Sequence, residues 1–237
     1  MTTIRSKYLD KLSNDFELLS ELVLKQLQLT REIMEEDLKD GKTHTEVEKN
    51  EVLIDGLDVM LRDEIINAIF LFSPKATDMR KLIAYIDMTF FLERIGDLVQ
   101  NIAHFSKKTR LDLPDFMEYR KILAKMLKLS EKMVKNAVFA FSCEDNTMAR
   151  DTIAIDDKVD ELQKEINDKI QQSFTEKPLS SQDLLNITSI NSISYNIERI
   201  ADNATNIAEA AIYLIEGKDV RHTQKQFEDE PGAKYFG

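Results

Sequence analysis

Four pairs of acidic residues, with the two members of each pair four positions apart, are the side chains in this sequence best suited to chemistry. The pairs are Glu51 with Asp55, Glu93 with Asp97, Asp156 with Asp160, and Glu198 with Asp202. Residues four apart share one face of an α-helix, so each pair would present two carboxylates together. Because 43 of the 237 residues are acidic, a single pair of this kind would carry no information.

The placement of the pairs relative to one another makes them informative. A shift of 105 residues carries the first two pairs onto the last two, which indicates an internal duplication. If the two helices that carry the pairs in each copy are antiparallel, Glu51 lies level with Asp97 and Asp55 lies level with Glu93. The second copy gives the same arrangement. Four carboxylates at one height repel one another, and bound cations relieve that repulsion most simply. We therefore predict two equivalent metal sites.

The available ligands restrict the kind of metal. Carboxylate-only ligation suits hard cations such as Mg, Ca, Mn or ferric iron, whereas Zn is less natural without Cys or His. The histidines His44, His104 and His222 all lie outside the pairs. Helical geometry also predicts that Glu93 and Asp97 point away from the apolar stripe of their own helix. Both features disfavour an inward-facing, oxygen-activating di-iron site.

Two asparagines extend the acidic face. Asn101 and Asn206 follow Asp97 and Asp202 by four residues and are candidate secondary ligands. A simpler interpretation also stays open, in which all these carboxylates form an ordinary solvated face balanced by neighbours such as Arg94. Arg199 would play the same part in the second copy.

The elements that must position these residues are six long helices. Apolar periodicity and helix-breaking residues predict helices at about 4–40, 42–72, 74–107, 115–142, 146–175 and 180–215. We expect Ser73 to cap the third helix with Pro74 at its first position, and Ser180 to cap the sixth with Asp183 three residues on. Gly217 is expected to end the last helix.

These helices predict an all-α fold of two tandem three-helix bundles. The first bundle covers residues 1–107 and the second 115–217, with a linker at 108–114 and a polar tail at 218–237. An apolar stripe at helical spacing marks the core face of the third helix in each copy. Its members are Tyr85, Met88, Leu92, Ile95, Val99 and Ile102 in the first copy, and Ile190, Ile193, Ile197, Ile200, Ala204 and Ile207 in the second.

Charge and composition exclude several classes of function. A formal charge of -11 opposes binding to nucleic acid or to anionic lipid. The sequence shows neither a signal peptide nor an apolar run of the roughly 20 residues that a membrane span needs, so we expect a cytoplasmic protein. The single cysteine, Cys143, is expected to be a buried or half-buried inert thiol. Without a Gly-rich phosphate loop or a Ser/His/Asp or Cys/His set, we do not expect an enzyme.

The sequence also resembles the PhoU family over essentially its whole length. The resemblance lies in LERIGDLVQNIA at 92–103 and IERIADNATNIA at 197–208, with Pro74–Arg80 before the first segment and EGKDVRH at 216–222. It implies the PhoU-like helical repeat and a phosphate-specific transport accessory protein that acts as a negative regulator of the phosphate-starvation response and of phosphate uptake. Leu185 stands where the first repeat has Arg80, and Ala201 where it has Gly96, so the first repeat is the closer match.

The resemblance further implies cofactors and partners. Multinuclear metal clusters, with iron, zinc, manganese or magnesium, would be held by the eight paired carboxylates. A cytoplasmic homodimer would couple the ATPase subunit of the phosphate ABC transporter to a sensor histidine kinase. Two alternatives remain at this stage: a metal-free helical adaptor whose acidic grooves bind basic partner helices, and a metal-dependent phosphohydrolase.

Overall fold

A computed structural model describes residues 2–36, 41–176 and 178–217, and its regular structure within these ranges is entirely helical. The long helices there are α1 (Thr2–Glu36), α2 (Lys42–Phe72), α3 (Ala76–Lys108), α4 (Met117–Cys143), α5 (Asn146–Glu176) and α6 (Ser181–Glu216), with a short 3₁₀ helix, η1 (Pro114–Phe116), before α4. The predicted all-α fold is confirmed. The predicted polar tail at 218–237 lies outside the described residues.

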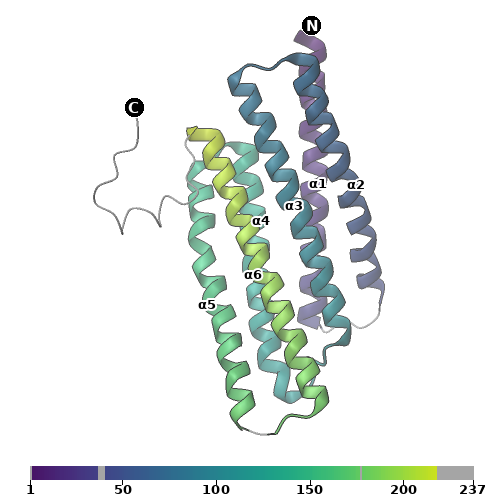
Figure 1. Ribbon diagram of the computed structural model, residues 1–237, viewed down its shortest axis with the longest axis vertical. Helices are drawn as coiled ribbons and strands as arrows, with labels where there is room; N and C mark the ends of the chain where they lie inside the picture. The colour runs from purple at the N-terminus through teal and green to yellow at the C-terminus, as the bar shows by residue number, and fades with distance from the viewer. Residues whose placement is uncertain (1, 37–40, 177, 218–237) are drawn as a thin grey trace, which may run out of the picture.

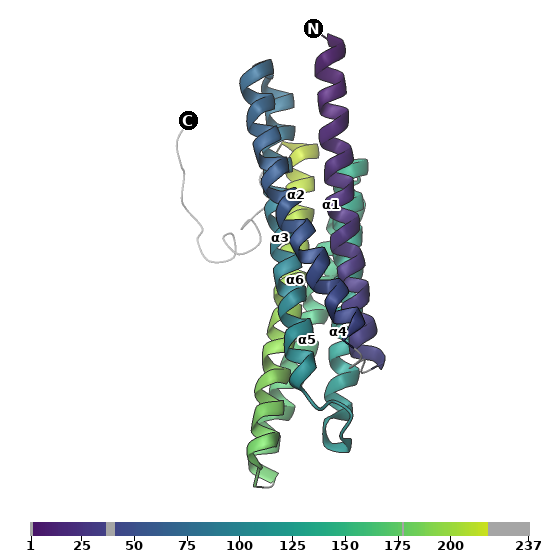
Figure 2. The same cartoon turned by 90° about the vertical axis from the view of Figure 1, so that its right-hand side faces the viewer.

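The helices run along the long axis of the molecule, and the two repeats run in opposite directions (Figure 1). The α2–α3 connection lies at one end and the α5–α6 connection at the other, so α3 and α6 pack together antiparallel (Figures 1 and 2). Helix α1 also packs against α4. Within the described ranges, no helix is long and apolar enough to cross a bilayer.

A continuous apolar core joins the two repeats. The predicted stripes on α3 and α6 are buried in it, with Met88 and Leu92 fully covered on α3 and Ile193 and Ile197 fully covered on α6. Tyr85, at the start of the α3 stripe, is half-buried. Removing these side chains from water supplies the main driving force for packing the helices. The two three-helix units therefore share one core.

The helix ends show one failure of the sequence reasoning. Ser73 does not cap α3; it lies at the end of α2 with φ 42°, and its N–H donates to the Ile69 carbonyl at 3.2 Å. Helix α3 begins at Ala76, and its N-cap residue, Lys75, makes no side-chain capping bond. Residues 73–75 thus form the connection that reverses the chain direction between α2 and α3, with Ser73 in the left-handed region.

The second repeat follows the prediction at its ends more closely. Ser180 and Asp183 form a reciprocal capping box at the start of α6, and Gly217 adopts φ 70° after its last turn. The prediction for Cys143 was wrong, because this residue ends α4 and its side chain is exposed.

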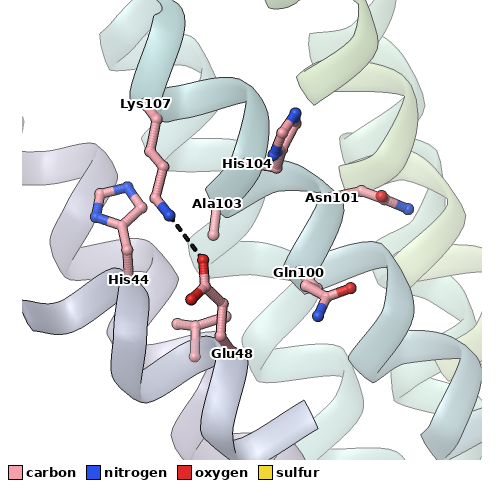
Figure 3. Close-up of a pocket in the computed structure, with 8 residues that line it drawn as sticks. His44, Glu48, Gln100, Asn101, Ala103, His104 and Lys107 are labelled. Atoms are coloured by element: carbon pink, nitrogen blue, oxygen red, sulfur yellow. Dashed lines mark hydrogen bonds and ion pairs between the residues drawn. The ribbon is translucent and has the colours of Figure 1, made fainter. Parts of the chain in front are cut away.

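Polar contacts fix α2 against α3 near the start of α2. Lys107 Nζ donates to Glu48 Oε1 at 2.7 Å, and His44 Nε2 lies 3.2 Å from Ser106 Oγ. Figure 3 shows His44 and Glu48 on one helix facing Lys107 on the other. This antiparallel pairing sets the register of the two helices that carry the first four carboxylates.

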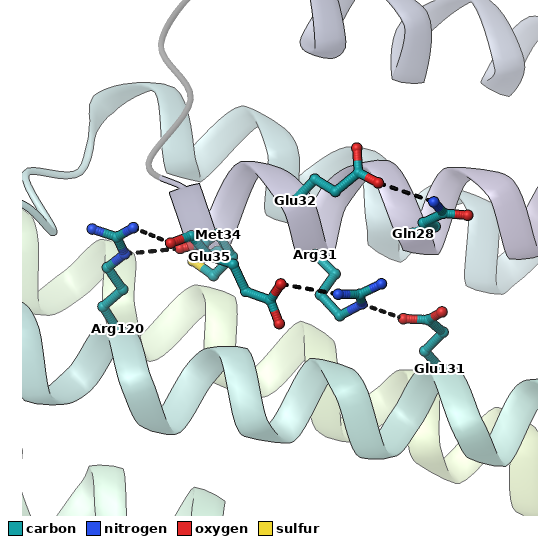
Figure 4. A network of polar contacts seen from close by, with 7 residues as sticks. All are labelled: Gln28, Arg31, Glu32, Met34, Glu35, Arg120 and Glu131. Carbon is teal, nitrogen blue, oxygen red and sulfur yellow. Dashed lines mark hydrogen bonds and ion pairs between the residues drawn. The ribbon is translucent and has the colours of Figure 1, made fainter.

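A second polar network joins α1 to α4 and so links the repeats (Figure 4). Arg31 Nε donates to Glu131 Oε2 at 2.7 Å, while its Nη1 donates to Glu35 Oε2 at 2.9 Å. Arg120 Nε donates to the Met34 carbonyl at 3.0 Å. A cation bonded to the last carbonyls of α1 stabilises that helix end through the helix dipole as well.

Arg80 joins the repeats at the opposite end of the molecule. Its guanidinium lies 5.7 Å from the centre of the Tyr213 ring, near the end of α6. A Cβ at Gly217 would approach Arg80 Nη1 to 2.9 Å, so the glycine leaves room for the arginine. Leu185 occupies the equivalent position in the second repeat but is 62% exposed, and the Arg80 contact is therefore specific to the first repeat.

Candidate metal centre

The first set of carboxylates lies between α2 and α3 at graded depth. Glu51 is only 4% exposed, Glu93 is half-buried, and Asp55 and Asp97 are exposed. The prediction that Glu93 and Asp97 turn away from the core agrees with their positions. Burial of Glu51 was not foreseen, and it gives the set a covered inner carboxylate and an open outer edge.

The charges of these four carboxylates interact between α2 and α3. Burial raises the pKa of Glu51 to about 7, and the negative charges of Asp97 and Asp55 add to the rise while a hydrogen bond from Gln26 opposes it. Burial also raises the pKa of Glu93, with further repulsion from Asp97 and Asp55. Charges from both helices thus act on each glutamate, as the antiparallel arrangement predicts.

Two residues that support Glu51 were missed by the sequence reasoning. Gln26 of α1 is fully buried, and its Nε2 donates to Glu51 Oε2 at 2.7 Å. Gly96 of α3 allows a close approach, because a Cβ there would lie 3.1 Å from Glu51 Oε2 and 3.4 Å from Gln26 Oε1. The detectable signal for Gln26 was a polar residue between apolar Val23 and Leu27 on the buried face of α1.

Asp58 is a fifth carboxylate that the sequence reasoning did not include. It is buried on α2, and its charge contributes to the raised pKa of Glu93. Arg62 Nε donates to Asp58 Oδ1 at 2.7 Å, and the Arg62 guanidinium lies 5.6 Å from the centre of the Phe90 ring. Asp58 lies three residues after Asp55, so its helical spacing was the available signal.

The second set, between α5 and α6, shows the same coupling. Burial raises the pKa of Asp156 to about 6, with added repulsion from Asp160 and Asp202. Burial raises the pKa of Glu198 to about 7, again with repulsion from Asp202, Asp160 and Asp156, and a partial offset from Arg199. The pKa of Asp202 is raised by burial and then by Asp160. The charges of all four predicted carboxylates therefore interact in this repeat too.

The two sets differ in a compensating way. Where the first repeat has Glu51 and Gly96, the second has Asp156 and Ala201 at the equivalent positions. Ala201 is fully buried. In the second repeat, Asp156 is one methylene shorter than Glu51, and Ala201 is one methyl group larger than Gly96. The shorter acidic side chain on α5 thus makes room for the larger residue on α6.

The simpler interpretation, an ordinary solvated acidic face, does not describe Glu51, which is 4% exposed, whereas four of the eight carboxylates are exposed: Asp55, Asp97, Asp160 and Asp202. The pKa is raised in Glu51, Glu93, Asp156, Glu198 and Asp202, five of the eight predicted ligands. Arg199, expected to balance the second set, lies 5.6 Å from the centre of the Tyr195 ring. Its charge offsets the rise at Glu198 without removing it.

Unsatisfied oxygens test whether a cation suits these sets. Glu51 Oε1, Asp156 Oδ1 and Glu198 Oε2 are buried and accept no hydrogen bond from the described part of the chain. Buried carboxylate oxygens without donors match the all-oxygen ligands that hard cations take. As the side chains stand, no group of three or more His, Cys, Asp or Glu residues in the described ranges is arranged to hold a metal ion.

The two predicted secondary ligands line separate grooves. Asn101 borders a groove of about 450 Å³ between α2 and α3, beside His104 and the Lys107–Glu48 ion pair (Figure 3). Asn206 borders a groove of about 280 Å³ between α3 and α6. The asparagines therefore occupy different surroundings in the two repeats.

Sequence comparison identifies the family. The PhoU domain matches residues 16–105 and again residues 123–211, so each repeat carries one copy. The chain belongs to the PhoU family. A PhoU relative from Aquifex aeolicus (strain VF5), named a phosphate-specific transport system accessory protein PhoU homolog, is 31% identical and the match covers 90% of this chain and 96% of the relative.

Other PhoU proteins agree with this assignment. The homolog 1 from Methanothermobacter thermautotrophicus, with the same descriptive name, is 31% identical over 88% of this chain and 93% of its own length. The crystal structure of PhoU from Pseudomonas aeruginosa superimposes with a TM-score of 0.80 at 24% identity, covering 90% of this chain and 99% of that one. PhoU from Streptococcus pneumoniae also gives 0.80, at 22% identity. These structures establish the shared fold.

Proposed function

We propose that this protein is an accessory protein of phosphate-specific transport that restrains phosphate uptake and the phosphate-starvation response. The observation that carries the proposal is the match to relatives bearing that name over nearly the full length of both chains. Both three-helix repeats are included in the match. A match of this extent supports a shared role more strongly than one common domain within a different architecture would.

The proposed protein holds cations in its two carboxylate sets. The ligands would be Glu51, Asp55, Glu93 and Asp97 in the first repeat and Asp156, Asp160, Glu198 and Asp202 in the second. Of iron, zinc, manganese and magnesium, oxygen-only ligands favour Mg, Mn or ferric iron. Bound cations would supply positive charge where buried carboxylates now repel one another. Binding requires the glutamates to lose their protons and the exposed aspartates to turn toward the same ion.

The proposed role is regulatory rather than catalytic. In this proposal a cytoplasmic homodimer couples the ATPase subunit of the phosphate transporter to a sensor histidine kinase. The names of the relatives support the link to transport. In this proposal the carboxylate sets bind cations and take no part in a catalysed reaction.

Deletion of the gene in the native host tests the proposal. Alkaline phosphatase activity and phosphate uptake would be measured in phosphate-rich medium. We expect both to stay high in the deletion strain and to return to normal when the parent gene is supplied. Normal repression without the gene would refute the regulatory role. The Asp97→Asn/Asp202→Asn variant separates the regulatory role from the metal sites. Normal repression by this variant would support the regulatory role and show that the role does not need the metal.

A further inference from the structure

The outer face of α2 carries an exposed apolar stripe that no element of the described chain covers. Its members are Val52, Val59, Ile66 and Phe70, which are 70%, 61%, 58% and 83% exposed. Spacings of seven, seven and four residues place all four within about 40° of arc on an α-helix. The stripe is about 27 Å long at 1.5 Å per residue. Such spacing is typical of a helix that packs against a partner helix.

The internal duplication provides a control for this stripe. At the equivalent positions 105 residues later, α5 carries Asp157, Lys164, Gln171 and Thr175. These four are exposed as well. The same fold is therefore compatible with polar residues at all four of these positions, and the apolar stripe of α2 is not a requirement of the fold. Contiguous exposed apolar surface of this kind marks interaction sites.

Charge along the stripe indicates the chemistry of the partner. Asp63 lies within the stripe between Val59 and Ile66, and Asp55 lies beside it; both are exposed. The neighbouring cation, Arg62, is bonded to Asp58, so it does not balance these two aspartates. An apolar seam with negative charge is complementary to a seam that is apolar with basic residues along its edges.

The same charges argue against two other occupants. If two copies paired antiparallel through this stripe, its midpoint near residue 61 would bring the two Asp63 side chains within about 6 Å along the axis, since they would lie four residues apart. Two like charges at such a short distance destabilise an apolar interface. An anionic membrane surface would be repelled by the aspartates and by the net charge of -11.

We infer that the outer face of α2, from Val52 to Phe70, docks an amphipathic helix of a partner protein whose apolar seam is flanked by Lys or Arg. This inference rests on the four exposed apolar residues, on the aspartates that lie within and beside the stripe, and on the polar residues that α5 carries at the matched positions. It does not require the phosphate-related role, and Asp63 keeps its negative charge within the stripe whether or not Asp55 holds a cation.

A designed peptide tests the docking face directly. The probe is a fluorescein-labelled helical peptide of 18 residues with leucine at heptad positions a and d and lysine at e and g; a matched peptide replaces lysine with glutamate. Binding to the full-length protein is followed by fluorescence anisotropy. The test variant is Val59→Thr/Ile66→Gln/Phe70→Thr, which gives two positions the residues of α5 and leaves the net charge unchanged. Gln171→Ala/Thr175→Ala on α5, which also leaves the net charge unchanged, is the control, and circular dichroism confirms that each variant is folded.

The inference predicts that the lysine peptide binds the parent and the α5 variant equally, and the α2 variant at least tenfold more weakly. The glutamate peptide should bind the parent at least tenfold more weakly than the lysine peptide does. Equal binding of the lysine peptide to the parent and the α2 variant would overturn the inference, because net charge alone would explain it. Two other results would also overturn it: parent binding to phosphatidylcholine vesicles that the α2 variant loses, or a parent dimer in sedimentation that the α2 variant converts to monomer.

Discussion

Replacing Glu51 by glutamine should stabilise the metal-free protein at alkaline pH. Glu51 is 4% exposed, and its Oε1 accepts no hydrogen bond within the described residues. In the Glu51→Gln variant the amide oxygen can still accept from Gln26, while the amide N–H can donate toward the carboxylates of Asp55 and Asp97. The substitution therefore removes a buried charge and keeps the shape of the side chain.

The size of the effect follows from the pKa. A rise from 4.5 to about 7 in the folded protein corresponds to about 3 kcal/mol of folding free energy, at about 1.4 kcal/mol per pH unit. Because the pKa of this acid is raised in the folded state, the charged form of Glu51 destabilises that state. This loss of folding free energy is fully present above the folded pKa and disappears as pH falls toward the unfolded pKa. We expect a gain of about 2–3 kcal/mol at pH 8 and below about 1 kcal/mol at pH 5.

Thermal unfolding in the presence of a chelator measures this gain. For a chain of this length, about 2–3 kcal/mol corresponds to a rise in Tm of roughly 4–12 °C at pH 8. Glu48→Gln, one turn away on α2, is the matched control. Since Lys107 lowers the pKa of Glu48, this variant should lose a little stability at pH 8. A Tm for Glu51→Gln at or below that of the parent at pH 8, or an equal gain at pH 5, would show that the charge of Glu51 does not destabilise the folded protein.

Three further outcomes are expected. Gly96→Ala places a Cβ about 3.1 Å from Glu51 Oε2, so manganese titration by calorimetry should show one weakened site and one unchanged site. Manganese affinity of the parent should rise at least tenfold from pH 6 to pH 8, because Glu51 and Glu198, each with a pKa of about 7, must lose protons to bind; a flat profile would contradict the proposed ligands. Arg31→Met removes the bond to Glu131 that joins α1 to α4, and thermal unfolding should show a Tm lower by roughly 2–4 °C for a loss of about 1 kcal/mol.

The sequence was sufficient for the helices and for the pairing of helices whose carboxylate charges interact. Apolar spacing on α3 and α6 identified faces that are buried in the structure, including Leu92 and Ile197. The duplication then gave a register that the coupled carboxylates of both repeats follow, with Glu51 near Asp97 and Asp160 near Glu198. These features depend on periodicity and on one repeated offset, both of which can be counted in a single sequence.

Contacts between distant helices could not be predicted in this way. Gln26 lies on α1, and only tertiary packing brings it to Glu51. Arg80 belongs to a motif near the start of the third helix, yet it contacts Tyr213 at the end of the sixth. The turn at Ser73 was also misjudged, because a Ser-Pro pair is a good helix start by local preference while the chain reversal needed that residue to end α2.

The metal content of the purified protein shows whether the two carboxylate sets hold cations. Elemental analysis of purified, dialysed protein would be carried out beside the Asp97→Asn/Asp202→Asn variant, which alters one exposed carboxylate in each set. We expect several equivalents of one metal in the parent and a loss of that metal in the variant, with both proteins folded. Absence of metal from the parent, or equal metal in both proteins, would contradict this expectation.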